Sequence, residues 1–146
     1  MTGAPLDLYP SMGLAEAART ASQFYDEALK GSGLKITQFS ILAALYYAPD
    51  VPLSKLARRL VIDRTTLTRN LRLLVRDGLV VLNENPGDKR ERRVALTDRG
   101  DELLVRFLPD WRRAQTAVIQ GMGRDQWDVL RLTLRKAVAV ATQAKD

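Results

Sequence analysis

The chain has 146 residues and a formal net charge of +6, and it contains no cysteine and no histidine. This length favours one domain, with or without an oligomerisation element. The missing residue types exclude disulfides and thiol redox chemistry and remove the commonest metal ligand, so we expect no metal and no cofactor. No apolar run approaches the ~20 residues that span a bilayer, and the N-terminus lacks the basic and apolar regions of a secretory signal, so we expect a cytoplasmic protein.

The first third of the chain is predicted to form two helices. Apolar residues recur every three or four residues from Leu14 to Ala28, as on one face of an amphipathic helix, and the sequence GSG at 31–33 ends it. Thr37 is placed to cap a second helix, which stops before Pro49. The side chains expected to face inward on this helix are Phe39, Leu42, Leu45 and Tyr46. The residues PDVP at 49–52 are interpreted as a loop.

Two short helices and a hairpin are predicted next. Ser54 is placed to cap a helix that runs to Leu60, and Asp63 to cap another that ends before Gly78. Short apolar-polar segments at 79–83 and 92–96 flank the turn residues ENPGDKRE, which predicts a β-hairpin.

The last third is predicted to form a long helix and a final helix, separated by GMG at 121–123. Thr97 is placed to cap the long helix, and Pro109 inside it predicts a kink or a restart. The apolar side chains of the final helix are spaced by three or four residues: Trp127, Leu130, Leu134, Val138 and Ala141.

The positive charge is concentrated in the middle of the chain. Residues 54–100 hold twelve basic and six acidic residues, whereas the rest of the chain holds eleven of each sign. Such a block is typical of a surface that binds a polyanion, nucleic acid first and an acidic membrane second.

The helix that begins at Asp63 has two opposite faces. At about 100° of rotation per residue, Leu67, Leu71 and Leu74 share one face. The opposite face holds Thr65, Arg69, Arg72 and Arg76, with Thr68 at its margin. Threonine and arginine donate to phosphates and to base edges, although a basic solvated face explains this helix taken alone equally well.

The neighbouring segments favour the DNA-binding interpretation. A short helix, the turn VID and a second helix have the spacing of a helix-turn-helix, and a hairpin directly after them makes it a winged helix. The cationic hairpin tip would lie against phosphates or enter the minor groove. At that tip, Asp88 and Arg90 are two residues apart, so either they pair and fix the arginine side chain or the aspartate is a turn former.

Four motifs in residues 61–104 resemble the core of the MarR family of bacterial transcriptional regulators. These are DRTTLTR at 63–69, GLV at 78–80, DKR at 88–90 and LTDRG at 96–100. The resemblance implies that Thr65, Thr66 and Arg69 contact bases or neighbouring phosphates, and that Arg90 is the wing arginine positioned by Asp88. The candidate recognition-helix residues are Arg64, Thr65, Thr66, Thr68, Arg69 and Arg72. The candidate wing residues are Asp88, Lys89, Arg90 and Arg92.

The expected fold class is mainly α (α+β), a winged helix-turn-helix domain at 37–97 with dimerisation helices at 1–36 and 98–146. Apolar stripes on helices at both chain ends would meet each other and a second copy, and the family resemblance likewise implies a homodimer. A homodimer would read a pseudo-palindromic operator in double-stranded DNA.

The resemblance also implies a small-molecule effector, aromatic or phenolic, bound between the two parts. Aromatic residues that could line such a cleft are Phe24, Tyr25, Phe39, Tyr46, Tyr47 and Trp111, although aromatics at helical spacing are ordinary core residues as well.

Three classes of function compete. The sequence favours a dimeric DNA-binding regulator, a repressor relieved by its effector. The alternative is a winged-helix protein-interaction module without direct DNA readout, which would use an apolar recognition face. An enzyme is not expected, because the sequence shows no nucleophile–base pair and no phosphate-binding glycine loop.

Overall fold

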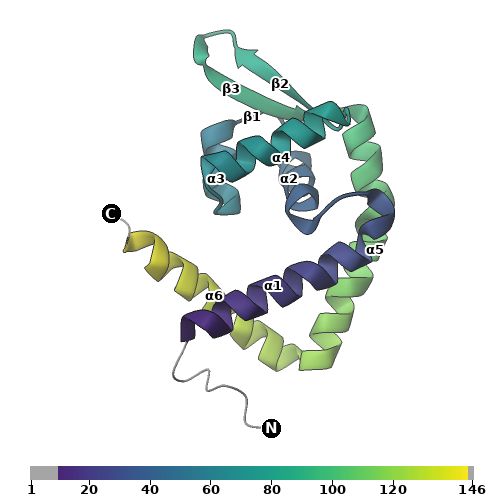
Figure 1. Ribbon diagram of the computed structural model, residues 1–146, viewed down its shortest axis with the longest axis vertical. Coiled ribbons are helices and arrows are strands. Elements are labelled where there is room, and N and C mark those ends of the chain that lie inside the picture. Colours follow the sequence, from purple (N-terminus) through teal and green to yellow (C-terminus); the bar gives the residue numbers. More distant parts are fainter. Residues whose placement is uncertain (1–9, 145–146) are drawn as a thin grey trace. The chain divides into compact units, whose positions relative to one another are not determined.

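The computed structural model describes residues 10–144 (Figure 1). In chain order the elements are α1 (Pro10–Ala28), the 3-10 helix η1 (Lys30–Ser32), α2 (Ile36–Tyr47), β1 (Val51–Pro52), α3 (Leu53–Leu60), α4 (Arg64–Arg76), β2 (Val80–Asn85), β3 (Asp88–Leu96), α5 (Asp98–Met122) and α6 (Arg124–Gln143). Helices with one small antiparallel sheet confirm the predicted fold class. None of the helices between residues 10 and 144 is long and apolar enough to cross a membrane.

The chain divides into two compact units, the first ending at Trp111 and the second beginning at Arg112. The core of the first unit lies between α2, α3, α4 and the sheet. Its most completely buried side chains are Leu29, Ile41, Leu42, Leu45, Leu56, Leu67, Leu71, Leu74 and Val94. Leu29, which follows α1, and Leu104 of α5 belong to this same core. The predicted divisions at 36/37 and 97/98 therefore fall inside one unit, and as functional divisions they stay predictions.

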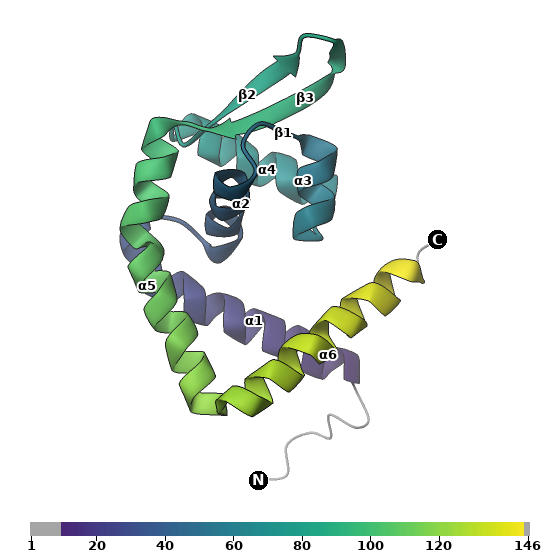
Figure 2. The same cartoon turned by 180° about the vertical axis from the view of Figure 1, so that it is seen from behind.

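The sheet has the strand order β1-β3-β2, with β3 in the middle and antiparallel to both neighbours. The strand β1 was predicted to be a loop, and that prediction is wrong: Val51 is paired with Val94 and Pro52 with Arg93. Proline removes a backbone donor, but an edge strand tolerates this loss. The hairpin of β2 and β3 extends well past β1 and projects away from the helices of this unit in both Figure 1 and Figure 2.

Two predicted helix caps are wrong. Thr37 does not cap α2, because the helix begins at Ile36. The Ile36 backbone N–H instead donates to Asp26 Oδ1 at 2.6 Å, and the Lys35 N–H donates to Gln38 Oε1 at 3.1 Å. Ser54 does not cap α3, which begins at Leu53 directly after Pro52. At α2 the side chains of Asp26 and Gln38 thus satisfy the first backbone donors, whereas α3 begins after Pro52 without a side-chain cap.

One further prediction fails within α2. Tyr46 was expected to face inward, but it is 48% exposed. At Pro109 a kink or a restart was expected; α5 runs without a break from Asp98 to Met122, so the helix does not restart, and the kink stays a prediction.

Other local predictions are confirmed. Asp63 caps α4, and Gly78, with φ of 71°, ends the turn after it. The Thr97 hydroxyl accepts from the Gly100 N–H at 3.0 Å and so caps α5. A Cβ at Gly100 would lie 2.0 Å from the Leu79 carbonyl oxygen, so only glycine fits where α5 packs on the start of β2. The hairpin is present with longer strands than expected, and its turn is reduced to Pro86 and Gly87.

Val61, which ends α3, has an unfavourable backbone conformation. Its φ of 54° and ψ of 46° are left-handed, and its side chain is 62% exposed. The left-handed region costs a residue with a Cβ about 1–2 kcal/mol, and a β-branched residue is rarely found there. We therefore expect Val61→Gly to increase the free energy of unfolding by about 1 kcal/mol, because the relief of strain exceeds the backbone entropy that glycine loses. Urea denaturation measures the change.

Val75→Gly is the matched control for this prediction. Val75 is also an exposed valine, but it lies inside α4 with ordinary helical geometry. Glycine should therefore lower stability there. If both substitutions destabilised the protein equally, the strain assigned to Val61 would be wrong.

Candidate nucleic-acid interface

The start of α4 is fixed by Asp63. The Thr66 backbone N–H donates to Asp63 Oδ1 at 2.8 Å, and the Thr66 hydroxyl donates to Asp63 Oδ2 at 2.6 Å. The hydroxyl bond first, and then the backbone bond, hold the pKa of Asp63 below its usual value. The folded-state pKa is lowered, so the cap is intact at neutral pH and is lost only as the pH falls through that lowered value. Thr66, predicted to contact DNA, therefore uses its hydroxyl proton within the protein.

The remaining predicted residues of α4 lie together on its exposed side. Leu67, Leu71 and Leu74 are buried, as expected from their spacing. A surface hollow of about 380 Å³ is lined by Arg64, Thr65, Thr68, Arg69 and Arg72. Five of the six candidate recognition-helix residues therefore line one concave surface, and Thr66 is the exception.

The predicted wing residues all lie on strand β3, which begins at Asp88 rather than at Arg92 as expected. Asp88, Lys89, Arg90 and Arg92 are all exposed. A second hollow, of about 230 Å³, is lined by Leu53, Ser54, Arg64, Asp88, Arg90, Glu91 and Arg92. Arg64 lines both hollows, so the candidate helix and wing residues meet at one surface of the first unit. Lys89 is not among the residues lining either of these two hollows.

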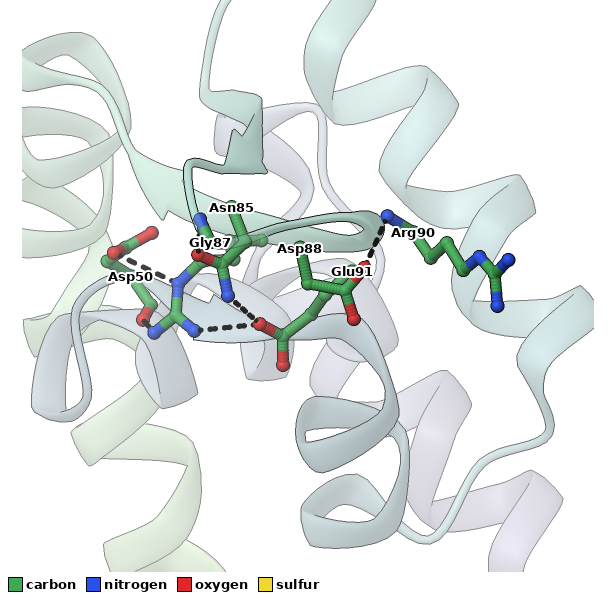
Figure 3. A network of polar contacts seen from close by, with 7 residues as sticks. Asp50, Asn85, Gly87, Asp88, Arg90 and Glu91 are labelled. Atoms are coloured by element: carbon green, nitrogen blue, oxygen red, sulfur yellow. Dashed lines mark hydrogen bonds and ion pairs between the residues drawn. The ribbon is translucent and has the colours of Figure 1, made fainter.

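The predicted pairing of Asp88 with the Arg90 side chain is not what the structure shows. Asp88 Oδ1 accepts from the backbone N–H of Arg90 at 2.9 Å. Figure 3 shows the Arg90 side chain pointing away from the Asp88 carboxylate. Asp88 therefore stabilises the start of β3 after the turn, as the turn-former interpretation expected, and leaves the Arg90 guanidinium facing outward.

No role was predicted for Arg93, yet its side chain makes more polar contacts than any other side chain of the hairpin. Its guanidinium bonds Asp50 and Glu91. One signal was present in the sequence: successive side chains of a strand point to opposite faces, so Arg93 lies on the face opposite to that of Arg90 and Arg92.

The six aromatic residues proposed for an effector cleft are distributed over several elements. Phe39 is buried in the core, and Trp111 is packed against it. Phe24 and Tyr25 make an edge contact on α1, and Tyr46 and Tyr47 make another at the end of α2, where Tyr47 is 73% exposed. An effector cleft built from these residues stays a prediction.

Potential metal ligands are not clustered in the part of the chain that the structure describes. Between residues 10 and 144, no three aspartate or glutamate side chains come together in a way that could hold an ion.

The arrangement defines the class of protein as a winged helix-turn-helix. A MarR family model matches residues 32–91. The HTH-type transcriptional repressor YetL of Bacillus subtilis is 31% identical over 126 residues, covering 85% of this chain and 74% of the relative. Among solved structures, the M. tuberculosis transcriptional regulator MOSR in complex with DNA is 37% identical, with a TM-score of 0.85 over 93% of this chain and 98% of that one. The transcriptional repressor CouR, bound to a 23-mer DNA duplex, is 25% identical, with a TM-score of 0.83 over 94% of this chain and 97% of that one.

The chain belongs to the MarR family of transcriptional regulators, as its motifs predicted.

Proposed function

We propose that the protein is a homodimeric repressor that binds a specific operator in double-stranded DNA through α4 and the β2–β3 wing. The observation that carries this proposal is the surface around Arg64. There the exposed face of α4, with Thr65, Arg69 and Arg72, meets the wing residues Arg90 and Arg92. A helix of this kind enters the major groove, whereas wing arginines suit the phosphates or the minor groove.

Two relatives support the proposal. YetL is named a transcriptional repressor, and MOSR was solved with DNA bound. Both are similar to this chain over most of its length, so the likeness includes α4 and the wing.

The alternative of a protein-interaction module is less well supported. An apolar recognition face would be expected for protein binding. Of the residues of α4, all of which the structure describes, Val75 is the one large apolar side chain that is exposed. The rest of the exposed side consists of arginine and threonine, which suits a polyanion.

Exposed apolar side chains support the homodimer. On α1, Leu14 is 55% exposed. On α6, Leu134 is 42% and Val138 46% exposed, on the stripe predicted to be apolar. A second copy of the chain would cover such a stripe.

Selection of bound sequences from a random or genomic DNA pool tests the proposal. We expect a palindromic consensus whose half-sites are about one helical turn apart. The selected operator then allows a measurement of salt dependence. If a dimer neutralises six to eight phosphates, the log of the association constant should fall against log salt with a slope between about −5 and −7. Failure to enrich any sequence, together with a flat salt response, would favour a protein partner instead.

A further inference from the structure

Arg93 connects the wing to the body of the first unit. In the sheet it lies opposite Pro52 of β1 and Asn83 of β2. Its Nε donates to Asp50 Oδ2 at 3.1 Å, and a terminal nitrogen donates to the Asp50 backbone carbonyl. The other terminal nitrogen lies 3.5 Å from Glu91 Oε2.

The contacts continue from Arg93 towards the tip of the hairpin. The Asn85 side-chain amide donates to the same Glu91 oxygen that Arg93 contacts. Asn85 Oδ1 in turn accepts from the Gly87 N–H at 3.0 Å, in the turn itself. Figure 3 shows this chain of contacts from Asp50, outside the hairpin, to Gly87 at its tip. We call Asp50, Asn85, Glu91 and Arg93 the wing clamp.

Arg93 differs from the wing arginines that face outward. Its side chain is only 26% exposed, and it is within bonding distance of two carboxylates, Asp50 and Glu91. Charge-assisted bonds of this kind are stronger than neutral ones and fix the orientation of the guanidinium. Arg93 is therefore occupied within the protein, whereas Arg90 and Arg92 are exposed beside the hollow next to α4.

The wing clamp lies where β1 stops pairing with β3. The strand β1 pairs only as far as Pro52 and Arg93, so beyond that point the hairpin consists of two strands. An isolated two-stranded hairpin is marginally stable and free to bend. Arg93 is thus the last residue of β3, towards the tip, that faces the third strand. Its bonds to Asp50 fix its side chain there, and its contact with Glu91, which Asn85 also bonds, connects the two-stranded part of the hairpin to the loop before β1.

Asp50 itself has a backbone conformation that is rarely occupied. Its φ is 55°, in the left-handed region, which aspartate tolerates better than most residues. Such conformations persist where the surrounding contacts hold them. The two bonds from Arg93, one to the carboxylate and one to the carbonyl of Asp50, supply such contacts.

We propose that Arg93 is a positioning residue, which Asp50 and Glu91 hold so that the wing is already oriented for DNA. This inference rests on the proposed function. A segment ordered before binding gives up less conformational entropy when it binds. An acidic residue, Asp50, would therefore strengthen the binding of a polyanion, which is the opposite of its direct electrostatic effect.

The test is the change in operator affinity caused by Asp50→Asn. This variant removes the charge but keeps a residue that tolerates the left-handed conformation. If Arg93 positions the wing, binding should weaken by about three- to tenfold, because the wing must be ordered during binding. If Arg93 instead contacts a phosphate directly, Asp50→Asn frees it and removes a repelling charge, and binding should tighten. The sign of the change decides between the two.

Glu84→Gln is the matched charge control. Glu84 is an exposed acid of β2 in the same hairpin, outside the wing clamp. Its loss should leave the affinity unchanged or raise it slightly. Arg93→Met and the double variant Asp50→Asn/Arg93→Met complete a double-mutant cycle. The double variant should bind about as weakly as Arg93→Met alone, and additive losses would contradict the clamp.

Hydrogen exchange of the free protein gives a readout that does not depend on DNA. Backbone amides of residues 83–92 should exchange faster in Asp50→Asn than in the parent chain, while those of α4 stay unchanged. Unchanged exchange in the wing would overturn the inference even if DNA binding were confirmed. If the parent chain bound no DNA, the proposed function would fail, and the exchange measurement would still decide whether the clamp orders the wing.

Discussion

Replacing Leu130 and Leu134 of α6 with aspartate should convert the dimer into monomers and remove most operator binding. Leu130 is half-buried and Leu134 is 42% exposed, and both lie on the apolar stripe of that helix. Two carboxylates buried in an apolar interface would each have to be desolvated without a partner, which the interface cannot compensate. A monomer can engage one half-site only, so we expect a loss on the order of 10³-fold, comparable to the gap between specific and non-specific binding. Sedimentation velocity and operator titration measure the two effects.

Val129→Asp/Leu132→Asp is the matched control. Both side chains belong to α6, are about 60% exposed, and lie on the side of the helix away from the stripe. This variant introduces the same two carboxylates, so it should remain a dimer and bind the operator. A stripe variant that stayed folded and dimeric would place the interface elsewhere. Circular dichroism separates that result from simple unfolding.

The parts of the fold that were predictable are those set by local chemistry. The spacing of Leu67, Leu71 and Leu74 fixes which side of α4 is buried. Asp63 lies at the start of that helix and Gly78 just past its end, which are the positions where a side-chain acceptor and a left-handed residue are needed. Because these requirements involve neighbouring residues, the helix-turn-helix could be recognised from the sequence alone.

The features that were missed depend on contacts between distant residues. Strand β1 is two residues long and contains a proline, so it forms only because β3 presents a pairing edge. Asp26, ten residues before Ile36, takes the capping role expected of Thr37. The partner of Arg93 is Asp50, 43 residues earlier, and no local pattern connects them.

The sequence predicted which residues lie at the candidate site better than it predicted what each of them contacts. Helical periodicity placed Thr65 and Arg69 on the exposed face of α4, and the structure has them lining one hollow. The relation of Asp88 to Arg90 could not be derived, because a carboxylate two residues away reaches either the backbone N–H or the guanidinium. The structure has the backbone bond.

Arg69→Ala and Arg90→Ala should weaken DNA binding in different ways. Arg69 lines the hollow on the exposed face of α4. Its loss should cost about 1–3 kcal/mol and relax the preference at particular base positions. Arg90 lies on the wing, which reads groove shape and charge rather than base edges. Its loss should weaken binding to related sites more evenly and make the salt slope shallower by about 1 for each contact removed. Titrations against an operator and its single-base variants, at several salt concentrations, separate the two patterns.

Two further variants make this comparison decisive. Arg135→Ala removes one positive charge from α6, outside the candidate interface, and should change the affinity little. Asp88→Ala removes an acid beside Arg90 and leaves the guanidinium free, because among residues 10–144 the Asp88 carboxylate bonds the Arg90 backbone N–H and not its side chain. The lost backbone bond weakens binding and the lost negative charge strengthens it, so Asp88→Ala should change the affinity less than Asp50→Asn does. Equal loss of base preference in Arg69→Ala and Arg90→Ala would mean that helix and wing do not divide the reading of DNA as proposed.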